Sequence, residues 1–195
     1  MQFSFFDKQR GKQASVPNIP EGFSYKPELI GPADEQRLVS DLSKLPFRDF
    51  EFHGYLGKRR VVSFGWKYDF TGPGLQKADD IPEFLLELRV HAASFARLKP
   101  EALQHVLVTE YAPGAGIGWH RDKNVFGDVI GISLLAPCVL RFRRKVDGAW
   151  ERAKMTAEPR SAYLLTGPAR HVWQHSIPRV DALRYSITFR NVLEE

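Results

Sequence analysis

Residues 184–190 read Arg-Tyr-Ser-Ile-Thr-Phe-Arg, and polar and apolar side chains alternate along the whole stretch. Successive side chains of a β-strand point to opposite faces, so this period of two predicts a strand with one apolar face for a core. The other face carries two arginines and two hydroxyls. That polar face is either exposed to solvent, as in many antiparallel sheets, or lines the interior of a barrel. In the second case it suits a carboxylate, which arginine binds through two parallel hydrogen bonds.

The same alternation recurs through the second half of the chain. Turn-forming pairs such as Pro113-Gly114 and Asp147-Gly148 separate the alternating segments. Many short strands joined by Gly and Pro turns are typical of a β-sandwich or barrel. Thr109 shares a strand face with Tyr111, and an inward tyrosine hydroxyl needs a hydrogen-bond partner. The segments predicted as strands are 105–111, 129–135, 138–144, 161–166, 172–177 and 184–193.

The first half of the chain has a different pattern. Residues 31–34, Gly-Pro-Ala-Asp, are typical of a helix start, and leucines at 38, 42 and 45 follow at helical spacing before Pro46. A second helix is predicted after Pro82, while glycines divide residues 50–70 into short strands and turns. Prolines make residues 1–30 irregular or extended. We therefore predict a mainly β, α+β fold in one domain, residues 1–195, with helical support from residues 1–103 and a β core over 104–195.

Composition limits the class of protein without naming it. The 195 residues are 43% apolar and 26% charged, which excludes a disordered chain, a coiled coil and a disulfide scaffold. No stretch approaches the roughly 18 consecutive apolar residues of a membrane span, and the N-terminus has no signal-peptide pattern. The single cysteine, Cys138, leads us to expect a reducing cytoplasm. The net charge of +5 permits a polyanionic partner.

Two histidines and a carboxylate could form a metal site. His120 and Asp122 are two residues apart, so an extended backbone would point both to one side. Such a pair also occurs on ordinary surfaces. Two histidines with one carboxylate form the facial triad of non-haem Fe(II) oxygenases, which leaves metal positions open. The second histidine could be His171 or His175, because a strand would place both on the same face.

Four motifs together resemble a known family. Tyr111-Ala112-Pro113-Gly114, His120-x-Asp122, His175 and the 184–190 strand, in this order, resemble the AlkB family of Fe(II)- and 2-oxoglutarate-dependent dioxygenases. The resemblance covers residues 104–192 and implies a double-stranded β-helix, or jelly roll, with Fe(II), 2-oxoglutarate and O₂ as cofactor and co-substrates. It also favours His175 over His171. By position it implies His120, Asp122 and His175 as iron ligands, and Thr109, Tyr111, Arg184, Ser186 and Arg190 around 2-oxoglutarate, with Arg190 also near Asp122.

The resemblance also implies a class of substrate, namely alkylated bases in DNA or RNA that are demethylated or hydroxylated during repair. In this family the segment before the core supplies a substrate lid. Here residues 52–68 combine aromatic and basic side chains, although a solvated basic turn would look the same. Arg141, Arg143 and Arg144 form a second basic cluster that could meet phosphate or solvent. The predicted substrate contacts are Tyr55, Arg59, Arg60, Trp66, Tyr68, Trp119 and Asn124.

Two other functions fit the same residues. A 2-oxoglutarate oxygenase of this fold could act on a protein side chain or a small molecule. A jelly-roll binding module could keep the metal site without turnover, although the complete set of ligands and arginines favours an enzyme. We expect a cytoplasmic monomer without membrane contact. The sequence does not specify the base, the lesion or the kind of strand.

Overall fold

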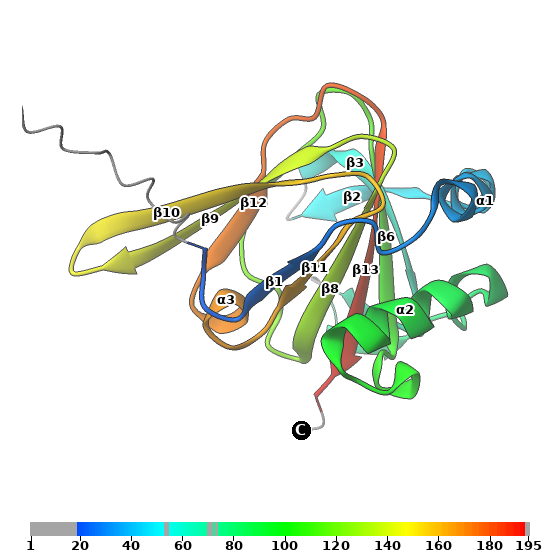
Figure 1. Ribbon diagram of the computed structural model, residues 1–195, viewed down its shortest axis with the longest axis horizontal. Helices are drawn as coiled ribbons and strands as arrows, with labels where there is room; N and C mark the ends of the chain where they lie inside the picture. The colour runs from blue at the N-terminus through cyan, green and yellow to red at the C-terminus, as the bar shows by residue number, and fades with distance from the viewer. Residues whose placement is uncertain (1–18, 53–54, 70–71, 73, 194–195) are drawn as a thin grey trace, which may run out of the picture.

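Two antiparallel β-sheets form the body of the protein (Figure 1). The computed structural model describes residues 19–52, 55–69, 72 and 74–193. A seven-stranded main sheet has the order β1-β11-β8-β13-β6-β3-β2, and a smaller sheet has the order β10-β9-β12-β7. The main-sheet strands are β1 (Phe23–Lys26), β2 (Arg48–Phe52), β3 (Tyr55–Phe64), β6 (His105–Tyr111), β8 (Phe126–Leu134), β11 (Ala162–Leu165) and β13 (Arg184–Val192).

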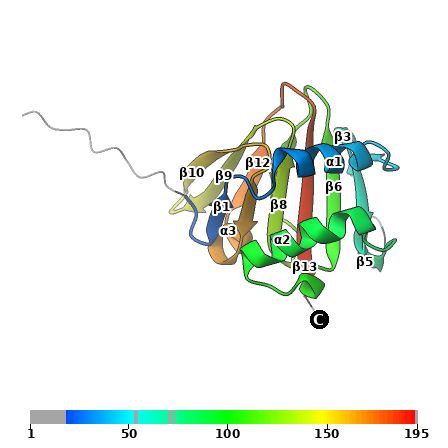
Figure 2. The ribbon, with the colours of Figure 1, turned by 45° about the vertical axis from the view of Figure 1, so that its right-hand side comes forward.

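The other elements surround this main sheet. The smaller sheet consists of β7 (Ile117–His120), β9 (Cys138–Val146), β10 (Ala149–Ala157) and β12 (Gln174–Ile177). A separate two-stranded hairpin consists of β4 (Trp66–Asp69) and β5 (Gly74–Lys77). The helices are α1 (Pro32–Leu42), η1 (Glu83–Leu85), α2 (Leu86–Ala96), η2 (Pro100–Ala102) and α3 (Gly167–His171). Figure 2 shows α1 and α2 side by side across one face of the main sheet. None of the helices in the described residues is long and apolar enough to span a membrane.

Strand β13 lies near the middle of the main sheet, between β6 and β8, and both of its faces are buried. Its apolar face, with Ile187 and Phe189, packs under the helices against Leu42 and Leu88. Each such buried side chain contributes about 1.5–3 kcal/mol to folding. The polar face is also covered, since Arg184 is fully buried. The polar face therefore lines the interior, where the smaller sheet covers it, and the solvent-exposed alternative is wrong.

The space between the two sheets contains a second core. It combines Tyr111 and Tyr163 from the main sheet with Leu140, Phe142 and Ile177 from the smaller one. The mainly β, jelly-roll class predicted from the sequence is confirmed. All six predicted strands exist, with ends shifted by one to three residues at most positions.

Some elements differ from the prediction. The first half of the chain is not only helical, because its strands β1, β2 and β3 extend the main sheet. The main sheet therefore contains residues from both sides of position 104. Strand β1 pairs with β11, with Phe23 opposite Leu165, and no local periodicity reveals so distant a partner. Strands β7 and β10 were not predicted. Residues 167–171, expected near a strand, form the short helix α3 because Pro168 opens its first turn.

Candidate metal centre and its surroundings

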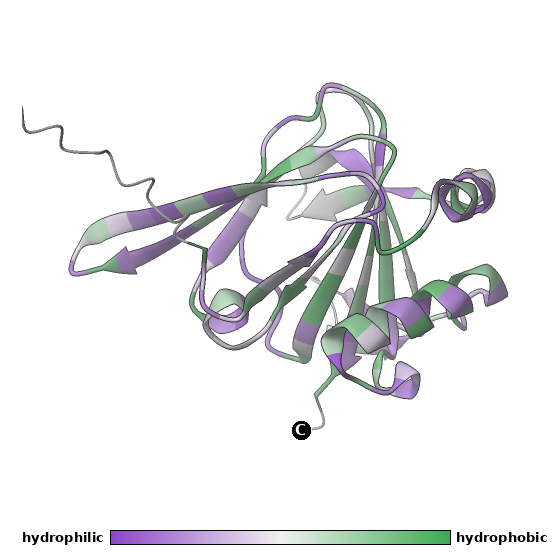
Figure 3. Ribbon diagram, viewed as in Figure 1, coloured by the Kyte–Doolittle hydropathy of each residue, from purple (hydrophilic) through white to green (hydrophobic). Residues whose placement is uncertain are grey.

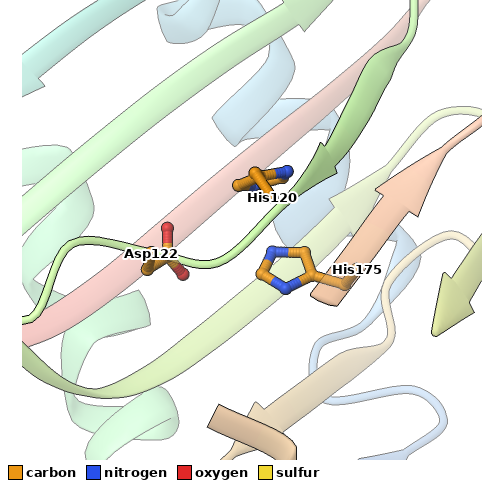
Figure 4. Close-up of side chains that lie close together, drawn as sticks. All are labelled: His120, Asp122 and His175. Atoms are coloured by element: carbon orange, nitrogen blue, oxygen red, sulfur yellow. The ribbon is translucent and has the colours of Figure 1, made fainter. Parts of the chain in front are cut away.

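The structure brings His120, Asp122 and His175 to one place. His120 ends β7 and stands directly opposite His175 of β12 in the antiparallel register, while Asp122 follows in the loop after β7. One potential ligand atom from each residue lies within 4.8 Å of the others. Figure 4 shows the three side chains gathered around a common space. His171 lies exposed at the end of α3 and is not part of this group.

The protonation states of these three residues suit a metal. Burial lowers the pKa of His175 to about 3 and also lowers the pKa of His120. Burial raises the pKa of Asp122, but the nearby side chains of Arg190, His175, His120 and Arg170 together outweigh burial and hold that pKa below its usual range. At neutral pH the imidazoles are therefore neutral and the carboxylate is ionised, as metal ligands must be. His120 Nδ1 lies 2.9 Å from the Gly118 carbonyl oxygen, which leaves Nε2 for a ligand role.

Arg190 orients the carboxylate of Asp122. Its Nη2 donates to Asp122 Oδ1 over 2.9 Å, and both side chains are no more than 10% exposed. Its Nη1 lies 3.3 Å from Nδ1 of buried His105. Oδ2 of Asp122 is buried and has no hydrogen-bond partner among the described residues. One oxygen is thus held by the protein and the other is available to a cation.

Arg170 holds the backbone of the same loop and was not predicted from the sequence. This buried side chain of α3 donates from Nη1 to the Asp122 carbonyl (3.2 Å) and from Nη2 to the Lys123 and Phe126 carbonyls (2.7 and 2.6 Å). Its Nε donates to the Gly127 carbonyl over 2.8 Å. Four carbonyl groups, two in the loop and two at the start of β8, share a single guanidinium, so Arg170 ties the loop that presents Asp122 to the strand that follows it.

Arg184 forms a second polar centre beside the triad. The side chain is fully buried, and its Nε donates to Ser133 Oγ over 3.0 Å. Both Nη atoms are buried without a hydrogen-bond partner among the described residues. Leaving two charged donors unpaired is costly, so this geometry fits an anionic ligand such as a carboxylate. Ser133 is a residue that sequence reasoning missed, although it lies opposite Ser186 in the register.

Two tyrosines border the Arg184 centre. The guanidinium carbon of Arg184 lies 5.0 Å from the centroid of the Tyr111 ring. Burial raises the pKa of both Tyr111 and Tyr163, so each phenol keeps its proton and can donate it to an acceptor. Tyr163 covers Gly131, where a Cβ atom would stand 2.2 Å from the ring carbon Cζ. Glycine is therefore required under this ring.

The predicted co-substrate residues Thr109 and Ser186 lie opposite one another in the register of β6 and β13. Both are buried, and they share the inner face with Arg184 and Tyr111. The residues that the sequence assigned to 2-oxoglutarate thus occupy one continuous surface between the sheets.

The structure separates the two predicted substrate arginines of β3. Arg59 stands opposite Tyr111 on the inner face, and its guanidinium stacks on Phe50 at 3.7 Å from the ring centroid. Arg60 points to the other face of the sheet and forms an ion pair with Glu110 at 2.7 Å. Alternation along the strand turns Arg60 away from the triad, so the structure does not bring this predicted substrate residue to the metal centre.

Trp119 also lies away from the triad. It precedes His120 in β7 and points to the opposite face of the smaller sheet, where Arg143 and Arg141 stack on its ring at 4.5 and 5.1 Å. It does not form a wall of the metal pocket. Strand alternation again decides this orientation.

The remaining predicted contacts lie at several places. Tyr68 lies beside the Asp122 loop, with Lys123 Nζ 5.0 Å from its ring centroid, and Asn124 is exposed in that loop. Trp66 lies with Lys77, whose Nζ is 4.0 Å from the ring centroid, next to a hollow bordered by Arg89 and Gln104. No described contact brings Trp66 to the triad. Tyr55 belongs to β3, but its side chain falls outside the described residues, as does His53.

A jelly roll with two histidines and a carboxylate around one point, next to a buried arginine suited to a carboxylate, defines a non-haem metal oxygenase. The comparisons place it in a family. Residues 25–190 match the family model of the 2OG-Fe(II) oxygenase superfamily, and the chain belongs to this superfamily. Within it, the chain is an AlkB-like dioxygenase. The side chains fit what this family requires, since Fe(II) would be held by the triad and 2-oxoglutarate by Arg184.

Relatives within the family carry informative names. The chain is 27% identical over 200 residues to an alkylated DNA repair protein ALKBH8 homolog of Arabidopsis thaliana, covering 89% of this chain and 56% of that protein. It is 28% identical over 152 residues to a probable RNA/DNA demethylase ALKBH6 of Danio rerio, covering 77% and 62%. The chain therefore spans less than two thirds of the length of each. The solved structure of OsALKBH1 shares the fold, with a TM-score of 0.65 and 19% identity over 87% of this chain and 98% of that one.

Proposed function

We propose that this Fe(II)- and 2-oxoglutarate-dependent dioxygenase oxidises alkylated bases in DNA or RNA. The observation that carries the oxygenase chemistry is the combination of the His120, Asp122 and His175 group with buried Arg184, whose two Nη atoms have no hydrogen-bond partner among the described residues. The nucleic-acid substrate is supported by the names of the two relatives and by cationic side chains near the triad. Arg59 lies on the inner face of the main sheet, and Lys123 lies in the Asp122 loop.

Each residue of the site has a definable task. His120, Asp122 and His175 would hold Fe(II), and Arg190 keeps Asp122 ionised and oriented toward it. Arg184 would bind the far carboxylate of 2-oxoglutarate through its two free Nη groups, and Tyr111 offers a further hydroxyl donor. Bound iron with 2-oxoglutarate and O₂ supplies the oxidation of a substrate C–H bond, with succinate and CO₂ as co-products.

The protein excludes water from this chemistry by packing. Tyr163 and Phe142 cover the space between the sheets, so the arginines lie in a low-dielectric interior where their attraction for carboxylate is stronger than in water. Hydroxylation of an N-methyl group gives a hydroxymethyl amine, which releases formaldehyde. The base would enter near the Asp122 loop, where Tyr68 offers a ring for stacking and Asn124 offers an exposed amide.

Mass spectrometry of methylated oligonucleotides tests the proposal. We would incubate the protein with Fe(II), 2-oxoglutarate, O₂ and single-stranded DNA or RNA that carries defined N-methyl bases. We expect a loss of about 14 Da per demethylated base, as CH₃ is replaced by H, together with formaldehyde and succinate in a 1:1 ratio. The variant Asp122→Ala serves as the control and should abolish all three. Succinate production with every oligonucleotide intact would overturn the nucleic-acid substrate and favour a protein or small-molecule substrate.

We also propose that the protein works in the reducing cytoplasm, which the free, buried Cys138 supports, and that it works as a monomer. Imaging of a fluorescent fusion and light scattering of the purified chain test these two points. Fluorescence confined to an oxidising compartment, or the mass of a dimer, would contradict them.

A further inference from the structure

The outer face of the smaller sheet is not used by the proposed chemistry. Strands β9 and β10 pair along their full lengths, from Ala149 opposite Val146 to Ala157 opposite Cys138, and project from the body as a long hairpin (Figure 1). Phe142 of β9 stands opposite His175 and faces the inner core. Alternation therefore turns the neighbouring side chains outward, and Figure 3 shows hydrophilic stretches along the hairpin.

This outer face carries a dense positive charge. Its cations are Arg141, Arg143 and Lys145 of β9 together with Arg152 and Lys154 of β10. Among the residues of the four strands that share this face, none is acidic. The acidic residue of β10, Glu151, points to the other face, where it pairs with Arg144 at 2.6 Å. A face with five cations and no counter-charge is complementary to a polyanion.

Tryptophans are interleaved with these cations. The guanidinium of Arg143 lies between two rings, 4.5 Å from the centroid of Trp119 and 4.3 Å from that of Trp150. Neighbouring side chains hold the arginines in place, since Arg143 Nε donates to Gln174 Oε1 over 2.7 Å and Arg141 Nε donates to Ser176 Oγ over 3.1 Å. Trp150 is 41% exposed, so part of this side chain is accessible to a partner. Arg141 and Arg143 are therefore held in place before any partner arrives, which lowers the entropy lost on binding.

The position of this face connects it to the metal centre. In the order β10-β9-β12-β7, strand β7 is the edge, and Trp119 on its outer face directly precedes His120 on its inner face. A ligand that crosses the sheet from β10 to β7 travels about 14 Å, three strand spacings, and reaches the loop that carries Asp122. A chain bound across the outer face could therefore continue around this edge toward the site.

We infer that the outer face of the β10-β9-β12-β7 sheet binds a single-stranded nucleic acid and leads it to the edge beside Asp122. The phosphates pair with the arginines and lysines of this face, and bases stack on Trp150. The stacking surface favours a single strand, because a duplex keeps its base faces covered. This inference rests on the proposed function for the direction of the strand, but the binding itself requires no catalysis.

The test measures the affinity for unmodified oligonucleotides, so that it is independent of demethylation. We would follow fluorescence anisotropy of labelled 12-nucleotide RNA and DNA strands without alkylated bases, at several salt concentrations. The double variant Arg152→Glu/Lys154→Glu reverses two exposed charges of the hairpin. The matched control Lys44→Glu/Lys99→Glu makes the same change in net charge at exposed positions near the helices.

We expect the hairpin variant to bind at least about 10-fold more weakly and to lower the salt slope by about 1.4, for two lost phosphate contacts on a single strand. The control should keep most of the affinity. Trp150→Ala should weaken binding roughly 5- to 100-fold, and Trp150→Phe should restore part of it. Unchanged thermal unfolding midpoints verify that the variants fold.

Three results would overturn the inference. One is wild-type affinity in the hairpin variant, and another is equal weakening in the control. The third is binding of anionic lipid vesicles or poly-glutamate with the same dependence on Trp150. In each case a wild-type protein that still demethylates a short methylated oligonucleotide would leave the proposed function standing, so the two failures are distinguishable.

Discussion

Arg190 Nη2 donates a hydrogen bond to Asp122 Oδ1 over 2.9 Å, across two elements that are 68 residues apart in the chain. This bond ties the central strand β13 to the loop that presents a metal-ligand candidate. The opposite oxygen, Oδ2, has no partner among the described residues, so a single bond sets which oxygen faces the triad. The same strand carries Arg184 six residues earlier, so β13 positions both the metal side and the co-substrate side of the site.

Replacing Arg190 by Met should weaken metal binding. The substitution keeps most of the buried volume but leaves Asp122 without its donor, and loss of such an outer partner typically costs 10- to 100-fold in metal affinity. Titration calorimetry with Mn(II) as a redox-stable probe measures this effect. Arg190→Lys should recover part of the affinity, because an ammonium can still donate to Oδ1. An Arg190→Met protein with wild-type Mn(II) affinity would show that the bond is not needed to orient the carboxylate.

Arg184→Met should separate co-substrate binding from metal binding. The two Nη atoms have no partner to lose among the described residues, and the variant gives up one Nε bond to Ser133 Oγ, so it should fold, while 2-oxoglutarate loses its carboxylate partner. With Mn(II) present, 2-oxoglutarate should raise the thermal midpoint of the wild type and leave that of the variant unchanged. Mn(II) affinity should stay within about threefold, since Arg184 does not contact the triad carboxylate. An equal 2-oxoglutarate shift in both proteins would place the carboxylate elsewhere.

Gly131→Ala should destabilise the protein through Tyr163. The new Cβ would stand 2.2 Å from Cζ of a rigid, buried ring, and the register of β8 with β11 prevents the ring from moving away freely. We expect a loss of about 1–3 kcal/mol in the free energy of unfolding by urea. Tyr163→Leu in the same background should recover part of the loss, because it removes the colliding ring atoms. Additive effects of the two substitutions would indicate that the ring does not press on residue 131.

Arg170→Met should loosen the Asp122 loop. It leaves four carbonyl groups, from Asp122 to Gly127, without their shared donor. Hydrogen exchange should accelerate at the amides of residues 122–127, and Mn(II) affinity should fall, with strand β13 protected as before. A readout of local exchange distinguishes this positioning role from general destabilisation, which would raise exchange in β13 as well.

The metal-free protein should lose stability as the pH falls below about 6.5. Burial lowers the pKa values of His105, His120 and His175 in the folded state, whereas the same groups titrate near 6.5 when unfolded. The unfolded chain therefore binds more protons below pH 6.5, and the free energy of unfolding falls with pH, down to about pH 3 for His175. Each histidine adds a slope of up to about 1.4 kcal/mol per pH unit. Asp122, with a lowered pKa, loses its contribution only near and below its usual range of about 4.

Urea unfolding at pH 7.5, 6 and 5 in the presence of a chelator measures this slope. His105→Asn removes one of the three groups and should flatten the dependence without removing a ligand candidate. A stability that is constant between pH 7.5 and 5 would contradict the burial of neutral imidazoles.

Local patterns along the chain were enough to predict the class of fold and the composition of the site. Alternation in residues 184–190 and in five other segments predicted the strands, because side-chain period reports which face is buried. The spacing of His120 and Asp122 and the arginine pair of the last strand pointed to the residues that the structure gathers. The alternation of polar and apolar residues did not show whether the polar face of β13 is exposed to solvent or lines an interior. That choice depends on the smaller sheet, whose strands β7 and β10 carry weak local signals.

The sequence by itself determined that the chain is a mainly β oxygenase and which residue types its site contains. The tertiary structure explains the preference for His175 over His171 that the motif resemblance implied, because His171 ends helix α3 while β12 places His175 opposite His120. It also separated Arg60 and Trp119 from the site, and it revealed Arg170, Ser133 and the Trp119–Arg143–Trp150 stack. Each of these depends on which strands pair and which face each side chain takes. Contacts between residues far apart in the chain decide those properties, and no local period reports such contacts.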